Sequence, residues 1–288
     1  MQILKKKHPL FAILFFLCWP GAMLAGDARK ANPHSKNREG IESSVIIYAA
    51  TPNAIKSDKY AISLNGKKGF VEKMERFDVP CNYTRLAYDG KQPLAIEIIA
   101  SGPIGSYTIS PENQKIKAAK KGNRLRFTIQ KPGYLVVQID SLGYLFLLID
   151  SPLSGVPTLG NPGVKNILDY GVDDSGQKLE TEKLQKAIDA ASAEPSGHIL
   201  YFPKGEYLTG QLNLKSNVNI YLEPGALIKG SNKVSDYFQS LLRFENVENV
   251  SISGHGTIDG SGWEGLRKSG GRELYLLFMS GCNNIRIE

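Results

Sequence analysis

The sequence predicts an all-β protein: an N-terminal β-sandwich followed by the first coils of a right-handed parallel β-helix with an N-terminal cap helix. Three observations predict this fold. Residues 45–150 hold short apolar runs separated by turn residues, residues 181–193 carry the one clear helical pattern, and a short motif recurs three times from residue 217 onward. Many short strands with regular turns indicate a sandwich, and self-similarity at a period of roughly 20–50 residues indicates stacked units.

Residues 1–26 have the order of a secretory signal peptide. Three lysines at positions 5–7 precede an apolar run at 10–19, and small residues around Ala25 provide a cleavage site. The apolar run is shorter than the roughly 20 residues that a membrane span needs. We therefore expect a secreted or periplasmic protein with no membrane span once the leader is removed. A retained N-terminal anchor is the alternative.

Cysteine usage and charge exclude two classes of protein. Cys81 and Cys282 remain after the leader is removed, and because they fall in different predicted domains, a disulfide scaffold is excluded and two buried free thiols are expected.

The formal net charge of +7 is unevenly distributed. Residues 44–150 carry 15 Lys/Arg against 9 Asp/Glu, whereas residues 151–288 carry 13 against 16. The basic first domain could attract an acidic glycan, although a solvated charged face is the commoner explanation. No basic-aromatic pattern is present, so no nucleic-acid partner is expected.

The β-sandwich is predicted over residues 44–150. Residues 124–130 alternate between polar and apolar side chains, which is typical of a strand with one buried face. Turn dipeptides such as Asn65-Gly66 separate the runs. This range contains no histidine and no catalytic constellation, so we expect a structural or glycan-positioning role.

A linker and a helix precede the repeats. Residues 151–163 contain three prolines and three glycines and predict a linker, and the β-helix is expected over residues 164–288. Thr181 is the expected N-cap of a helix over residues 181–193, which covers the first coil. The apolar residues of its single buried face are Leu184, Ala187, Ile188 and Ala191.

The repeated motif is an asparagine with apolar residues at the first and third positions after it. Asn217-Val-Asn-Ile, Asn249-Val-Ser-Ile and Asn284-Ile-Arg-Ile recur at offsets of 32 and 35 residues. Asparagine and glycine tolerate the left-handed backbone that the corners of a β-helix require. We therefore expect the three asparagines at equivalent corners, with the apolar residues stacked inside.

Several motifs carry a resemblance to a known family. Asn-Ile-Leu-Asp-Tyr-Gly at 166–171, Tyr-Phe-Pro-Lys-Gly-Glu-Tyr at 201–207, Leu-Glu-Pro-Gly-Ala at 222–226 and Gly-Thr-Ile-Asp-Gly at 256–260 together resemble the pectate-lyase-like β-helix superfamily, above all glycoside hydrolase family 28, the polygalacturonases and rhamnogalacturonases. The sandwich, which ends at residues 145–152, resembles the N-terminal domain of family 49 dextranases. The resemblance implies a monomeric, cofactor-free glycosidase that hydrolyses a polysaccharide with inversion. A cell-wall polysaccharide such as acidic pectin is the implied substrate.

The catalytic motifs of that family do not fall where they should. In chain order they are Asn-x-Asp, Asp-Asp, Gly-His-Gly and Arg-x-Lys. Here no Asn-x-Asp follows the start of the coils, Asp173-Asp174 precedes the cap helix, and Arg286-Ile-Glu288 stands in place of Arg-x-Lys. His255 lies in a Gly-His-Gly that aligns with a coil corner, so a structural or groove-edge role is expected. We expect this chain to be the N-terminal part of a longer enzyme, with no catalytic and no metal-binding residue of its own and the catalytic residues beyond Glu288.

The remaining polar candidates have structural explanations as well. Asp259 is expected to bond its own turn, and Trp263 either stacks on a sugar or covers the flank of the coils. Substrate-binding residues stay open. A polysaccharide lyase on the same scaffold, which would need clustered Asp residues on Ca²⁺ and an Arg base, and a non-catalytic β-helical glycan-binding protein are the alternatives. Carboxylates of the coils that fall in no catalytic motif are Glu206, Glu223, Glu245 and Glu248.

Overall fold

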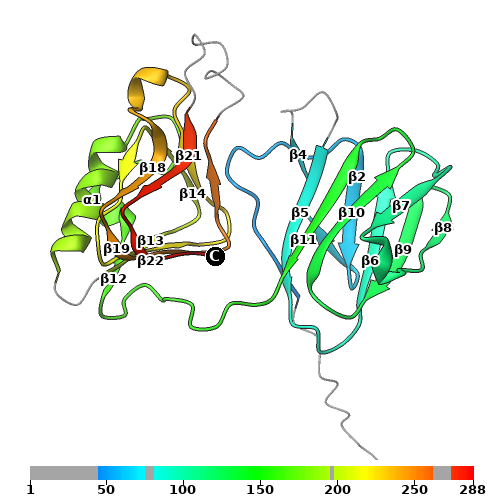
Figure 1. The fold of residues 1–288 in the computed structure, drawn as a ribbon. Coiled ribbons are helices and arrows are strands. Elements are labelled where there is room, and N and C mark those ends of the chain that lie inside the picture. The colour runs from blue at the N-terminus through cyan, green and yellow to red at the C-terminus, as the bar shows by residue number, and fades with distance from the viewer. Residues whose placement is uncertain (1–44, 75–80, 195–197, 262–273) are drawn as a thin grey trace, which may run out of the picture. The chain divides into compact units, whose positions relative to one another are not determined.

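The computed structural model confirms the all-β prediction (Figure 1). The described residues are 45–74, 81–194, 198–261 and 274–288. The predicted signal peptide at 1–26 and Trp263 lie outside these ranges. Among the described residues, no helix is both long and apolar enough to cross a membrane.

The first part of the described chain is a sandwich of two sheets. One sheet has the strand order β1-β5-β11-β10-β7, with β4 also paired to β5, and the other has the order β3-β2-β6-β9-β8. Strand pairs are antiparallel except that β5 and β11 run parallel. The elements are β1 Val45–Ile47, β2 Tyr60–Leu64, β3 Lys67–Gly69, β4 Glu72–Met74, β5 Cys81–Tyr88, β6 Leu94–Ala100, β7 Tyr107–Ser110, the short helix η1 Glu112–Gln114, β8 Ala119–Lys121, β9 Arg124–Ile129, β10 Gly133–Ile139 and β11 Tyr144–Asp150.

The sandwich core follows from the alternation in its strands. In β9, Leu125, Phe127 and Ile129 are buried in one cluster with the buried residues of β6, while the residues between them are exposed. Burying each such side chain contributes about 1.5–3 kcal/mol. At the turn between β2 and β3, Asn65 and Gly66 both have positive φ, at 48° and 80°, as a tight hairpin requires.

Residues 151–163 form neither helix nor strand, and three parallel sheets of a β-helix follow. Their orders are β12-β13-β16-β19-β22, β14-β17-β20 and β15-β18-β21. All of these strand pairs are parallel, so each turn of chain, or coil, lies on the previous one. The elements are β12 Val164–Asn166, η2 Ile167–Tyr170, α1 Thr181–Ala193, β13 His198–Phe202, β14 Gly205–Thr209, β15 Leu212–Asn213, β16 Val218–Leu222, β17 Ala226–Gly230, η3 Val234–Asp236, β18 Ser240–Glu245, β19 Glu248–Gly254, β20 Thr257–Asp259, β21 Tyr275–Ser280 and β22 Asn283–Ile287.

The repeated asparagines form a ladder along one corner of the coils. Asn217, Asn249 and Asn284 have φ values of 64°, 56° and 52°. The Asn249 side-chain amide donates to the side-chain oxygen Oδ1 of Asn217 at 3.2 Å across 32 residues. The Asn284 amide donates to the Asn249 oxygen at 2.8 Å across 35 residues. The predicted left-handed corners and both repeat lengths are confirmed.

Helix α1 packs its predicted apolar face into the β-helix core. Its residues Leu184, Ala187, Ile188 and Ala191 are all buried in one cluster with the coil interior. The prediction that Thr181 is the N-cap is wrong, because Glu180 holds that position and makes no side-chain cap. The Thr181 hydroxyl instead accepts a hydrogen bond from the Gly210 amide at 2.7 Å, which ties the start of the helix to the coil.

Both described cysteines are free thiols. Cys81 is buried as predicted, and its burial raises its pKa. Cys282 is only half-buried, so the prediction of two buried thiols is wrong for this residue. Its sulfur lies 3.4 Å from the Phe244 carbonyl oxygen.

Candidate functional site

The Gly-His-Gly segment at residues 254–256 lies between β19 and β20 and contacts the sandwich. The His255 ring stacks on Tyr48, with ring centroids 4.6 Å apart. Its Nδ1 atom lies 3.6 Å from Oδ2 of Asp150, the last residue of β11. The His255 side chain is 14% exposed, so its ring has little access to a substrate.

Arg85 of β5 holds this segment through three hydrogen bonds. Its guanidinium donates to the carbonyl oxygens of His255 at 2.7 Å and Gly256 at 2.9 Å, and to the Thr257 hydroxyl at 2.6 Å. A guanidinium presents its donors in a fixed fork, which suits it to binding several backbone acceptors at once. Arg85 therefore fixes the path of the chain between β19 and β20.

The surroundings of His255 favour the neutral form of its ring. Burial lowers the pKa of its imidazole, the Arg85 charge lowers it further, and the Asp150 carboxylate opposes both. Within the described residues, Nε2 of His255 has no hydrogen-bond partner. Burial also raises the pKa of the Tyr48 hydroxyl, with Asp150 adding to this effect. These groups lie in the contact between the sandwich and the coils.

A cavity of about 1120 Å³ lies beside this contact. Strands β4, β5 and β11 of the sandwich and strands β14, β17 and β20 of the coils supply most of its walls. This volume lies just above the range typical of small-molecule sites, about 300–1,000 Å³. Its polar lining residues include Asn53, Arg85, Tyr134, Asp150, Glu206, Lys229 and Asp259.

Glu206 of β14 is the most deeply buried carboxylate of this cavity, with 2% of its surface exposed. Lys229 of β17 forms an ion pair with it at 3.1 Å. The Asn53 side-chain amide of the sandwich donates to its other oxygen at 2.5 Å. A buried charge must be paired and hydrogen-bonded to be tolerated. Both oxygens of Glu206 therefore have structural partners.

The other polar candidates bond locally. Asp259 Oδ1 accepts a hydrogen bond from the Ser261 amide at 2.9 Å, as an aspartate in a corner turn does. Glu223 accepts from the Lys204 amide at 3.0 Å. Glu245, at the end of β18, pairs with Arg243 at 2.9 Å. The exposed Glu248 begins β19.

Asp173 and Asp174 lie before α1, at the start of the β-helix, as the sequence order requires. Asp173 accepts hydrogen bonds from Ser175 and Lys178, which lower the pKa of its carboxyl to about 2. The Asp174 carbonyl oxygen accepts from the Glu206 amide at 2.7 Å. This segment extends the stack of the coils at β14.

No group of three or more His, Cys, Asp or Glu side chains within the described ranges is arranged to hold a metal ion. What the described cavity offers is hydroxyl, amide, cationic and anionic groups around an open space. Such groups can bind a sugar by hydrogen bonds. The contributions of Tyr48, Arg85 and Asp150 to the contact at His255 were missed at the sequence level, because the hydrogen-bonded residues are separated by as many as 172 positions.

The comparisons with known proteins agree with the geometry of the coils. Residues 164–243 match the family model of rhamnogalacturonase A/epimerase, pectate lyase-like proteins. An exo-poly-alpha-D-galacturonosidase of Dickeya chrysanthemi is 30% identical over 175 residues, covering 53% of this chain and 27% of that enzyme. An iota-carrageenase of Zobellia galactanivorans is 36% identical over 100 residues, covering 32% of this chain and 20% of that protein. The chain thus spans about a quarter or less of the length of these relatives.

The solved structure of Dex49A from Penicillium minioluteum is similar over 83% of this chain and 55% of that one, with a TM-score of 0.50 and 14% sequence identity. At this identity the likeness shows the fold alone. The family model confirms the predicted resemblance of residues 164–243 to pectate-lyase-like proteins, and the likeness to Dex49A is one of fold.

Proposed function

We propose that the chain belongs to a secreted glycosidase that hydrolyses a polysaccharide in the manner of polygalacturonases. The match of the first coils, residues 164–243, to the rhamnogalacturonase family model carries this proposal. The galacturonosidase relative at 30% identity supports it. The substrate class that fits is a polysaccharide such as acidic pectin, and export follows from the predicted signal peptide. The protein acts as a monomer and needs no cofactor.

Hydrolysis with inversion needs two carboxyl groups about 6.5–9.5 Å apart, one to protonate the leaving oxygen and one to activate water. The described coil carboxylates are poorly placed for this task. Glu206 is buried in an ion pair with Lys229, and Asp259 bonds the Ser261 amide of its own turn. We therefore propose that the catalytic pair is not among these described carboxylates.

The direct test is the complete product of the gene, incubated with polygalacturonate. We expect reducing ends to accumulate, and nuclear magnetic resonance of the first products to show an inverted anomeric configuration. Neutral dextran serves as the control polymer and should not be cut. Unsaturated products, which absorb in the near ultraviolet, would identify a lyase and contradict the proposal. Absence of any cleavage of acidic or neutral polysaccharides would favour a binding protein.

A further inference from the structure

The sandwich has a pocket of its own, separate from the cavity beside His255. Its volume is about 1070 Å³. Its floor is the solvent-facing side of the sheet β3-β2-β6-β9-β8, where cross-strand neighbours form a row. Ser63 pairs with Glu97, Glu97 with Arg126, and Arg126 with Ala119. Ala95 pairs with Thr128 in the adjoining row.

Several side chains on this side of the sheet are small. Ser63, Ala95 and Ala119 reach little above the backbone, and four adjacent strands span roughly 14 Å at about 4.8 Å per strand. Core-facing residues alternate with them, so that Ile96 and Phe127 are buried on the other side of the sheet. The result is a solvent-facing floor on which a sugar ring can lie beside Glu97 and Arg126.

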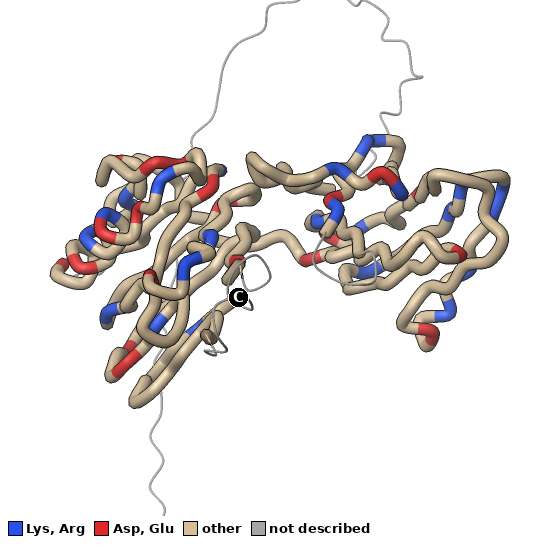
Figure 2. Tube along the Cα trace, turned by 90° about the horizontal axis from the view of Figure 1, so that it is seen from above, with Lys and Arg blue, Asp and Glu red and all other residues tan. Residues whose placement is uncertain are grey.

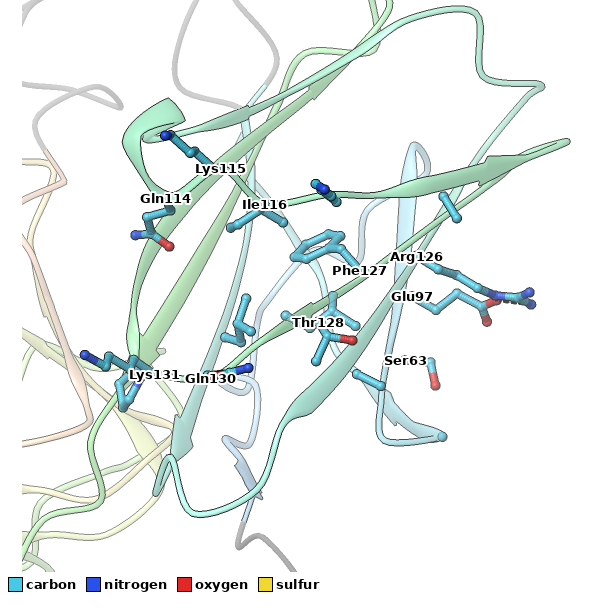
Figure 3. A pocket seen from close by; sticks show the side chains of 17 residues that line it. Ser63, Glu97, Gln114, Lys115, Ile116, Arg126, Phe127, Thr128, Gln130 and Lys131 are labelled. Atoms are coloured by element: carbon cyan, nitrogen blue, oxygen red, sulfur yellow. Dashed lines mark hydrogen bonds and ion pairs between the residues drawn. The ribbon is translucent and has the colours of Figure 1, made fainter.

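Cations surround this floor. Residues 115–119 alternate between exposed and half-buried, so that Lys115 and Lys117 share the exposed side with Ala119. Lys131 lies just after β9. Figure 3 shows Lys115 and Lys131 toward one end of the pocket and Arg126 beside Glu97 toward the other.

The single carboxylate of the lining is already neutralised. Glu97 pairs with Arg126 at 2.6 Å and with Arg124 at 2.8 Å. Within the described part of the chain, no ion pair joins Lys115, Lys117 or Lys131 to a carboxylate. Like charges held together in this way attract anions. Figure 2 marks the Lys and Arg positions of the sandwich in blue and the fewer Asp and Glu positions in red.

The lining residues restrict the class of ligand that this pocket can bind. Phe127 is the one aromatic residue among the described lining residues, and it is 5% exposed, so no aromatic face is available for a neutral sugar or a base to stack on. Hydroxyl and amide groups from Ser63, Thr128, Gln114 and Gln130 can bond sugar hydroxyls. Recognition must therefore depend on charge together with sugar hydroxyls.

We propose that this sandwich pocket binds a segment of an acidic polysaccharide, with Lys115, Lys117 and Lys131 paired to its carboxylate or sulfate groups. Lysine acts as a point charge on such groups, and Arg126 can exchange Glu97 for them because their ion pair is exposed. Binding of this kind does not require the chain to cleave any bond. It would hold the polymer on the sandwich while other residues act on it.

The test is titration calorimetry of the full chain with trigalacturonate, an iota-carrageenan tetrasaccharide and neutral isomaltotriose. A pocket variant, Lys115→Gln with Lys117→Gln and Lys131→Gln, is compared with a control of equal charge change outside the lining, Lys67→Gln with Lys68→Gln and Lys121→Gln. All six lysines are exposed, so both variants should fold, which circular dichroism verifies.

We expect at least one acidic probe to bind and the neutral one not to. The acidic probe that binds identifies carboxylate or sulfate as the natural group. The affinity for the acidic probe should fall roughly tenfold in the pocket variant and by less than about twofold in the control variant. Added salt should lower the affinity of the unmodified protein for the same probe. Equal losses in both variants would mean attraction by net charge alone and overturn the proposal. So would binding of isomaltotriose or of a thymidine hexanucleotide as tight as that of the acidic sugars, or failure of both acidic probes to bind.

Discussion

Replacing Ile188 with aspartate is expected to destabilise the β-helix severely. Ile188 is fully buried between α1 and the coils. Removing a side chain of this size costs about 2–5 kcal/mol. Burying a carboxyl group without a partner adds at least about 1–3 kcal/mol. The expected loss is therefore about 3–8 kcal/mol, which is comparable with the whole stability of a typical domain, about 5–15 kcal/mol.

The matched control is Ala190→Asp, which adds the same charge to the exposed face of α1. Its effect should be about 1–1.5 kcal/mol, the loss expected from helix propensity and from a negative charge in the last turn of α1. Urea unfolding followed by circular dichroism gives the stabilities, and hydrogen exchange read by mass spectrometry assigns them. Amides of β13 and β16 should exchange faster in Ile188→Asp, while those of β6 and β9 should not change. If Ile188→Asp and Ala190→Asp unfolded at the same urea concentration, α1 would not be a packed cover of the coils.

Two further perturbations test the packing around the corner that contains His255. Because burial lowers the pKa of His255, the unfolded chain binds its proton more readily, so the free energy of unfolding should fall as the pH drops below about 6.5. Urea midpoints measured from about pH 7 to pH 5 should show this fall, and a His255→Asn variant should make the midpoint less dependent on pH. The same pH dependence in the variant as in the parent would contradict the prediction. Gly254→Ala should lower the free energy of unfolding by about 2–6 kcal/mol, since φ is +109° and the added Cβ would lie 2.1 Å from the Leu222 carbonyl oxygen. The control is Gly102→Ala, because nothing lies within 4 Å of a Cβ added there. Equal melting temperatures of the two variants would refute the reasoning.

The fold could be predicted because its signals are local and repeated. The alternation in residues 124–130 and the single apolar face of α1 each specify one buried side. The asparagine motif gave the coil spacing, since a left-handed corner favours the same residue type in each coil. One local error was the N-cap. Thr181 is a favoured capping residue, but Glu180 takes that position, and its carbonyl oxygen accepts from the Leu184 amide at 3.0 Å.

The site could be predicted only in part. Sequence order alone places His255 in a coil corner, and the Asp259 turn bond follows from local chemistry. The partners of His255 cannot be found in this way, because Tyr48, Arg85 and Asp150 belong to the other half of the chain and are brought to it only by folding. Likewise, the sandwich pocket depends on strand register across β2, β6 and β9, which composition does not specify.

The central claim is that these coils belong to a polysaccharide hydrolase whose catalytic carboxylates are not among those described. Reducing-end release from polygalacturonate, measured for the full-length protein and for its His255→Ala and Asp259→Asn variants, tests it most directly. The account predicts release by the parent protein that both variants retain. Release that disappears in either variant would contradict it, because the catalytic group would then lie in the corner that we assign to structure.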